Sequence, residues 1–454
     1  MKDKGVLGLK RVLGLPEVVG IEVGQTIGAG VFAMTGIAIG ICGAALPVAY
    51  VLAVLPVAFF MLPVAVLGAA IPTVGGNYTY PSRLFSPAAA FMGLWIYAIG
   101  AFFGFFPLYA MTMVKYLSHF FPQINVPVAA ALVLTFFYAV NLFGVRFAAQ
   151  VQGLMVLVMI SALVMYALFG IGHIDPANLS LAAPGDKPLS IVSAAALLTF
   201  PYMGANAIIE LGGEIKKPHR TIPISFLISI PLVAVIYISM SFVAVGVTGW
   251  EACADKSLIE SAQAFLKPIP LNFFIIGGAV LAIATTLNAT FMWGTKSLMI
   301  VGRDGLLPFF LTRVNKRFGT PWNMLTAIWA LSVIAVLSGI DVKSFAIYSS
   351  IGGLVIFIPV LIASVMLKRK MPEAWAASRF KVPTPVLIGC IVIGILFFIV
   401  AIAALFGELW KTNRFMFWLF FVLVVVGITY YLVMKKVVKK RGVSKGDIER
   451  GRLF

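Results

Sequence analysis

The amino-acid sequence predicts an all-α polytopic membrane protein with about twelve transmembrane helices. Hydrophobic residues make up 61% of the 454 positions and charged residues only 11%, whereas a soluble domain averages about 25% charged residues. The apolar runs are long and continuous, as at 48–67 and 415–434, which is typical of membrane helices rather than of barrel strands. The distribution of lysine and arginine along the chain supports the same fold class.

Each predicted helix is an apolar run bounded by charged loops or by proline and glycine clusters, such as 72–76 and 183–186. No small-residue cleavage site closes the first run, so it is predicted to be a retained helix rather than a signal peptide. No stretch is long and polar enough for a soluble domain. In order, the predicted spans are 16–40, 44–70, 86–115, 126–144, 150–172, 190–211, 223–247, 269–300, 322–340, 345–367, 384–406 and 414–434.

Basic residues are expected to concentrate on the cytoplasmic side of a membrane protein. With both termini placed inside, Lys296 falls within a membrane segment, and 26 of the other 33 lysines and arginines fall on the inner side. The net charge of +18 therefore predicts a multi-pass plasma-membrane protein that contacts anionic lipids, without nucleic acid as a partner. The outer exceptions are Lys115, Lys187, Lys256, Lys267, Lys343, Lys411 and Arg414.

The cysteines and histidines do not form a ligand pattern. Cys42, Cys253 and Cys390 are widely separated, and the three histidines stand alone in the sequence. This spacing argues against a disulfide framework and against a transition-metal site. No cofactor is predicted, apart from Na⁺ as a candidate coupling ion.

Two apolar segments contain helix-breaking residues at a depth where a membrane helix should be continuous. The first is the stretch from Gly24 to Phe32, and the second is the stretch from Thr199 to Asn206. Glycine weakens a helix and proline removes a backbone donor. Because irregular backbone in a membrane must be buried in protein or line a cavity, a matched pair of breaks points to the binding site of a transporter.

The breaks fall in the first and sixth segments, which predicts two repeats of five helices. Since five is odd, the second repeat enters the membrane from the opposite side, and two further helices follow it. The predicted organisation is a cytoplasmic N-terminus at 1–15, the first repeat at 16–172, an extracellular loop at 173–189, the inverted repeat at 190–367, a cytoplasmic loop at 368–383, two added helices at 384–434 and a basic cytoplasmic tail at 435–454.

Three motifs resemble those of the amino acid–polyamine–organocation transporters. Residues 27–32 match the signature I-G-x-G-[IV]-F, residues 214–223 match E-x-K-x-P-x-R-x-I-P, and residues 303–308 match R-D-G-x-L-P, preceded by a fitting Asn288-Ala289 pair. The resemblance extends over about 300 residues. It implies the five-plus-five inverted repeat with two added helices, and secondary active transport of amino acids or related amines.

A broken helix exposes backbone groups that suit a zwitterion. The amides of residues 28–30 are expected to bind an α-carboxylate, and carbonyls near the sixth-segment break are expected to accept from an α-ammonium. The alternative is that these glycines only allow close helix packing, and that the nearby aromatic residues are packing residues. The candidate substrate-binding residues are Ile27, Gly28, Ala29, Gly30, Phe102, Tyr109, Phe200, Tyr202, Met203, Gly204, Asn206 and Tyr348.

The coupling ion is left open between Na⁺ and H⁺. Some family members carry a lysine on the fifth segment that links transport to protons, but alignment from residues 149–152 puts Met159 at that position. Resemblance to sodium-coupled relatives of this fold implies a Na⁺ site formed by Gly24, Ile27, Thr285 and Thr286. The alternative is that both threonine hydroxyls bond to their own helix.

Ionisable residues inside a membrane are functional candidates because burying their charge is costly. Glu22, Glu210 and Lys296 are predicted to lie toward the inner side, where a carboxylate and Lys296 form a gate or Glu22 carries a proton. A static ion pair between helices is the alternative. Where the family often has Phe-Glu, this chain has Ala205-Asn206, and the missing carboxylate favours a neutral substrate.

Other functions remain as alternatives to a symporter. A substrate/substrate exchanger of the same fold, an ion channel and a non-transporting amino-acid sensor are all compatible with a helical bundle. No TVGYG-like filter, HExxH motif or paired intramembrane aspartate occurs in the sequence, so neither a potassium channel filter nor an enzyme is predicted, and no residue is assigned a catalytic role. The sequence makes no prediction of the oligomeric state.

Overall fold

The computed structural model describes residues 11, 13–28, 30–142, 145–179, 188–313, 315 and 320–440. This part is nearly all helical, and the β-structure reported in it is a single bridge between Leu13 and Ile215. It contains eight helical stretches long and apolar enough to cross a membrane, together with shorter apolar helices at Val126–Leu142, Met155–Ile171 and Trp322–Leu337. One long stretch, Leu15–Ala70, contains two predicted crossings, so these helices account for all twelve predicted segments and confirm the fold class.

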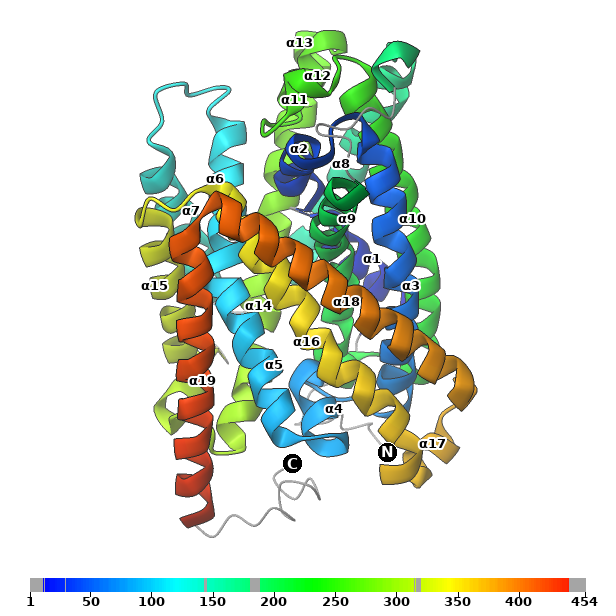
Figure 1. Cartoon of the computed structure of the whole chain (residues 1–454), viewed down its shortest axis with the longest axis vertical. Helices are drawn as coiled ribbons and strands as arrows, with labels where there is room; N and C mark the ends of the chain where they lie inside the picture. The colour runs from blue at the N-terminus through cyan, green and yellow to red at the C-terminus, as the bar shows by residue number, and fades with distance from the viewer. Residues whose placement is uncertain are drawn as a thin grey trace.

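The long helices follow the predicted order, with short helices in several connections (Figure 1). Their bounds are α1 Leu15–Ile27, α2 Gly30–Cys42, α3 Leu46–Ala70, α4 Gly76–Leu84, α5 Pro87–Gly100, α6 Phe106–Leu117, α7 Val126–Leu142, α8 Val145–Ile171, α9 Pro188–Tyr202, α10 Pro218–Gly246, α11 Trp250–Cys253, α12 Ile259–Phe265, α13 Pro268–Phe273, α14 Leu281–Arg303, α15 Trp322–Leu337, α16 Val342–Lys370, α17 Pro372–Ala377, α18 Thr384–Thr412 and α19 Arg414–Lys440.

The connections sort to two ends of the bundle. Figure 1 shows α4 and α17 at one end and α11, α12 and α13 at the other. The first two belong to loops predicted to be cytoplasmic, and the last three lie in or border a loop predicted to be external. The arrangement of the connections therefore agrees with the alternation of sides that the basic residues predict.

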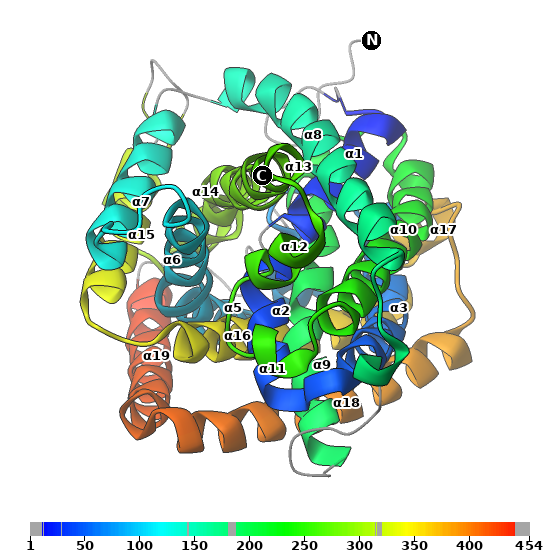
Figure 2. The same ribbon diagram turned by 90° about the horizontal axis from the view of Figure 1, so that it is seen from above.

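The helices differ in how deeply they are buried. In the view of Figure 2, α2 and α9 lie in the interior, whereas α7, α15, α18 and α19 lie at the periphery. The most apolar window of the α9 span is 82% buried within the protein, whereas that of α19 is 17% buried. The outer helices expose leucine, isoleucine, valine and phenylalanine, as expected of surfaces that face lipid tails.

Both predicted interruptions are present, but in different forms. The first transmembrane segment consists of two separate helices, because α1 ends at Ile27 and α2 begins at Gly30. The sixth segment changes from α-helix to a 3₁₀ helix, Met203–Glu210, directly after Tyr202. The five-helix inverted repeat that these positions suggest stays a prediction.

Two further irregularities were not predicted from the sequence. The third segment contains the π-helical turn Ala101–Phe105, and the eighth contains the π-helical turn Phe274–Val280. Single π-helical turns often occur at functional sites, because the extra residue redirects the side chains around it. The turn in the third segment ends at Phe105, which lines a cavity together with Pro201 and Gly204 of the sixth segment.

Candidate functional site

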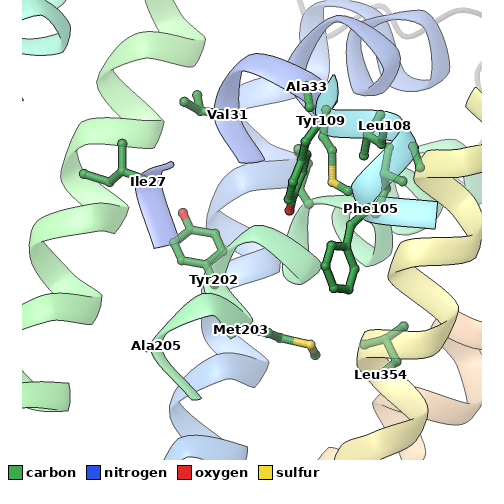
Figure 3. Packing of buried hydrophobic residues seen from close by; sticks show 14 of the residues in the cluster. Ile27, Val31, Ala33, Phe105, Leu108, Tyr109, Tyr202, Met203, Ala205 and Leu354 are labelled. Atoms are coloured by element: carbon green, nitrogen blue, oxygen red, sulfur yellow. The ribbon is translucent and has the colours of Figure 1, made fainter. Parts of the chain in front are cut away.

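The two interrupted segments pack directly against each other. A Cβ added to Gly30 would collide with the ring of Pro201, and one added to Gly204 would lie 2.7 Å from the carbonyl oxygen of Gln25. Figure 3 shows the end of α1 at Ile27, the start of α2 near Val31, and the segment carrying Tyr202 and Met203 beside them. Close packing therefore explains the two glycines, and the same packing brings both breaks to one place.

The backbone groups at the first break have different partners. The N–H of Gly28 donates to the carbonyl of Gly24 at 3.1 Å, so it completes α1, and Ala29 lies outside the described residues. Gly30 begins α2, and the first N–H groups of a helix have no acceptor within that helix. The candidate anion donors at this break are therefore the amides at the start of α2.

The carbonyl of Thr26, at the end of α1, is satisfied by a neighbouring helix. The Tyr237 hydroxyl of α10 donates to it, and both side chains are buried. The Tyr202 ring packs edge-on against Tyr237, with 5.0 Å between ring centroids. Aromatic residues of α9 and α10 therefore hold the end of α1 in place.

Several buried polar atoms around the breaks lack a hydrogen-bond partner in the described part of the chain. They are Gln25 Oε1, Thr26 Oγ1, Tyr202 Oη, Asn206 Oδ1 and Trp293 Nε1. Buried polar side chains almost always have a partner, because leaving one unsatisfied costs about 1–3 kcal/mol. Their concentration at the two breaks marks this region as the candidate ligand site.

All of these residues except Tyr202 line one cavity, whose empty space of about 560 Å³ includes the part that is open to solvent. Among the described residues that line it none is charged, and its walls combine aromatic rings with amide and hydroxyl groups. Figure 3 shows the side chains of Phe105 and Tyr109 pointing toward the helical segment that carries Met203. The lining residues are Gln25, Thr26, Asn77, Tyr97, Phe105, Tyr109, Pro201, Met203, Gly204, Asn206, Ala207, Thr290, Trp293, Gly353, Ile356 and Phe357.

The cavity lining includes some of the predicted substrate residues and omits others. Tyr109, Met203, Gly204 and Asn206 line it, whereas Phe102 does not. Tyr348 is also outside the lining; it is buried, and its hydroxyl donates to the carbonyl of Met416 in α19. Ile27 is fully buried beside the break, and Phe200 belongs to the last turn of α9.

Sequence reasoning missed Gln25, Asn77, Tyr97 and Trp293 in the cavity wall. A signal was present for Gln25, which is a polar residue inside the glycine-rich stretch of the first segment. The other three lie on helices far away in the sequence. Only the packing of α4, α5 and α14 brings them to the breaks.

The four residues of the candidate Na⁺ site lie along α1 and α14. The hydroxyls of Thr285 and Thr286 both donate to the carbonyl of Ala282, at 2.7 and 3.0 Å. The Thr286 hydroxyl lies so close to Gly28 that a Cβ at Gly28 would collide with it. Both hydroxyls therefore bond to their own helix, which is the alternative to a cation site, and Na⁺ binding by these four residues stays a prediction.

Glu22 and Glu210 each accept hydrogen bonds from another helix. Both oxygens of the buried Glu22 carboxylate accept at 2.7 Å from serines of α10, Ser225 and Ser229. Glu210 accepts from the backbone N–H of Asn77 at 3.1 Å and from the Ser297 hydroxyl at 2.9 Å. Lys296, the neighbour of Ser297, attracts the Glu210 carboxylate electrostatically.

Met159, at the position of the family's fifth-segment lysine, is fully buried.

A second charged cluster connects α4 to the loop that follows α14, at the end of the bundle where α4 lies. Arg83 of α4 binds Asp304 through both terminal nitrogens, at 2.7 and 2.8 Å, and the Tyr78 hydroxyl donates to the same carboxylate at 2.8 Å. Asp304 follows α14 and belongs to the motif at 303–308. The arrangement explains structurally why an aspartate stands in this loop, because it fixes α4 to the end of α14.

The interrupted helices, the uncharged cavity and the all-helical membrane bundle define a polytopic transporter of small molecules. The chain belongs to the amino acid permease family, whose pattern matches residues 13–428. It is therefore a multi-pass membrane transporter of amino acids rather than an enzyme.

Several characterised proteins are similar over most of the chain. Identity is 26% to a branched-chain amino acid permease, BcaP, of Bacillus subtilis, across 95% of both chains. It is 25% to a methylthioribose transporter of the same organism, across 82% of this chain and 84% of that protein. A cationic amino acid transporter of Arabidopsis thaliana is 27% identical across 80% of this chain and 63% of its own length.

Proposed function

We propose that this permease moves neutral amino acids or related amines across the plasma membrane by alternating access. The observation that carries the proposal is the contact between the two interrupted segments, where buried polar atoms lack partners beside a cavity with no charged wall. A cationic or anionic side chain would have no opposite charge in this cavity. A neutral substrate avoids that desolvation cost.

The substrate's charged ends are proposed to bind the backbone. The first amides of α2 suit an α-carboxylate, because a helix N-terminus carries partial positive charge. Carbonyls at the junction of α9 and the 3₁₀ helix, around Phe200, Tyr202 and Met203, would accept from the α-ammonium. The side chain of the substrate would then extend toward Tyr109 and Asn206.

Transport is proposed to be coupled to a cation at one of two places. Na⁺ would be bound by backbone carbonyls of Gly24 and Ile27 and by the hydroxyl oxygens of Thr285 and Thr286. A proton would instead be carried by Glu22, which sits between α1 and α10 and would lose one of its serine bonds when α1 tilts. In either case, Lys296 and Glu210 would act as a gate on the side of the bundle that carries α4.

Both termini are proposed to be cytoplasmic, with the basic inner loops and tail contacting anionic lipids. This orientation follows the distribution of lysine and arginine. It agrees with the position of α4 and α17 at one end of the bundle.

Uptake into proteoliposomes tests the function directly. Purified protein should accumulate a radiolabelled neutral amino acid above the external concentration when an inward cation gradient is applied. An exchanger would accumulate label only with substrate loaded inside, a channel would equilibrate without accumulation, and a sensor would bind the ligand without uptake. Any of these three results would contradict the proposed symport.

Two substitutions separate the coupling alternatives. Under the Na⁺ alternative, replacing Na⁺ by choline at fixed pH abolishes accumulation, and Thr286→Ala raises the Na⁺ concentration for half-maximal uptake by about tenfold. Under the proton alternative, uptake is indifferent to choline, and Glu22→Gln abolishes accumulation driven by a pH gradient while exchange continues. Ser332→Ala, which removes a buried hydroxyl bonded only within α15, is the control for both.

A further inference from the structure

We propose that the cavity beside the breaks selects substrates whose side chain ends in a primary carboxamide, as in glutamine or asparagine. The inference rests on the proposed transport function and adds the chemical class of the substrate. The three groups that carry it are Gln25 Oε1, Asn206 Oδ1 and Trp293 Nε1, which all belong to lining residues and all lack a partner among the described residues.

The orientation of the Gln25 amide follows from its neighbour. Thr290 donates its hydroxyl hydrogen to the carbonyl of Thr286 at 2.7 Å, so its oxygen can only accept from Gln25. The Gln25 Nε2 group meets it at 3.4 Å. This contact fixes the nitrogen toward α14 and leaves Gln25 Oε1 as an acceptor without a partner.

A second network fixes the Asn206 amide. Glu210 accepts a hydrogen bond from the backbone N–H of Asn77 at 3.1 Å. Because a carboxylate can only accept, the Asn77 amide turns its nitrogen rather than its oxygen toward Glu210. The remaining Asn77 oxygen accepts from Asn206 Nδ2 at 2.7 Å. Asn206 Oδ1 therefore becomes the second acceptor without a partner, on a residue that is only 5% exposed.

Trp293 supplies the complementary donor. Its indole N–H can only donate, and its nitrogen is buried without a partner. The ring of Trp293 stacks on Tyr97, with 6.3 Å between centroids, which holds the indole against the cavity wall. The set of unpaired groups is thus two acceptors and one donor.

A primary carboxamide can pair with all three groups, because it has two N–H donors for the two acceptors and one carbonyl oxygen for the donor. A hydroxyl can satisfy two of the three groups, and an aliphatic side chain satisfies none. A site built to hydrogen-bond its substrate rejects analogues that leave its buried polar groups unpaired. The cavity should therefore discriminate against leucine, although relatives of this chain include a branched-chain amino acid permease.

Competition for uptake tests the selectivity with the full chain in proteoliposomes. The informative pairs have nearly equal shape: asparagine with leucine, and glutamine with methionine. In whichever pair fits the cavity better, we expect the carboxamide amino acid to compete for uptake at least tenfold more strongly than the apolar one. Threonine should compete with intermediate strength. An apolar member that competes equally or better in both pairs would overturn the subsite, while transport itself would still stand.

Three shape-preserving variants assign the effect to the named atoms. Gln25→Met, Asn206→Leu and Trp293→Phe should each reduce the carboxamide-to-apolar ratio by fivefold or more, because the apolar substrate no longer leaves that polar atom unpaired. Ser332→Ala should leave the ratio unchanged. The ratio does not depend on how much protein folds, so unchanged ratios in all three variants would refute the assignment. Failure to bind any amino acid would instead contradict the proposed function.

Discussion

The first and sixth membrane segments are both interrupted, but their interruptions are held in different ways. Around the first break, Gly28 faces the Thr286 hydroxyl, Gly30 faces the Pro201 ring and the Thr26 carbonyl is bound by Tyr237, so side chains make the contacts. In the sixth segment, Gly204 packs on the backbone of Gln25 and Thr26. The Thr286 and Tyr237 side chains can move or be shortened, whereas the Pro201 ring of the sixth segment and a helix backbone cannot. The sixth segment should therefore tolerate change less well.

The 3₁₀ form of the sixth segment fits this difference. A 3₁₀ helix is narrower than an α-helix, so it permits a closer approach of two backbones. The first segment instead interrupts the helix completely, which leaves backbone ends for neighbouring side chains to bind. One break thus provides close contact, and the other provides polar backbone groups.

Adding a methyl group at Gly204 should have the largest effect. In Gly204→Ala the new Cβ would lie 2.7 Å from Gln25 O and 2.8 Å from the Thr26 Cα, and neither atom can move without displacing α1. We expect a loss of about 3 kcal/mol and a reduction of transport by more than tenfold. Uptake and the thermal midpoint of the detergent-purified protein measure both effects.

Gly20→Ala is the matched control, because no described atom beyond its own helix backbone lies within 4 Å of a Cβ at Gly20 on α1. It should be neutral or slightly stabilising, since alanine favours a helix over glycine by about 1 kcal/mol. Equal effects of the two substitutions would contradict the idea that backbone contact limits the sixth segment.

Gly28→Ala should reduce uptake, and a second substitution should restore part of the lost uptake. The added Cβ collides with the Thr286 hydroxyl, and we expect uptake to fall about tenfold. Removing that hydroxyl in Gly28→Ala/Thr286→Ala should recover part of the loss when uptake is measured at saturating Na⁺, as analysed by a double-mutant cycle. Strict additivity of the two changes would show that the contact is not what limits the first break.

Tyr237→Phe should have the smallest effect. It leaves the Thr26 carbonyl without its donor, at a cost of about 1 kcal/mol or roughly a fivefold change. Because this carbonyl lies at the break, the loss should show in substrate affinity as well as in stability.

Tyr348→Phe is the corresponding control, since it also removes a buried hydroxyl that donates to a carbonyl, that of Met416. It should lower the thermal midpoint without changing substrate affinity. If Tyr237→Phe and Tyr348→Phe both changed substrate affinity, the effect would not be specific to the tyrosine at the break.

The architecture was accessible from the sequence because its causes are local. Long apolar runs predict the crossings, and glycine or proline predicts where a helix is interrupted, as at Gly28 and next to Pro201, one residue before the end of α9. The contacts of the site are not local. Asp304 was recognised within a motif, but its bond to Arg83 joins residues 221 positions apart. Similarly, Tyr348 looked like a pocket residue, and only the packing of α19 shows its hydroxyl bound to Met416.

Hydropathy, basic residues and helix breakers by themselves determined a helical membrane protein with interruptions in its first and sixth segments. Each of these signals acts through the few residues around it, so a linear reading recovers them. The tertiary structure alone decided which polar atoms are left unpaired at the breaks. The direction of the Gln25 amide depends on a hydrogen that Thr290, 265 residues away, has already donated within its own helix.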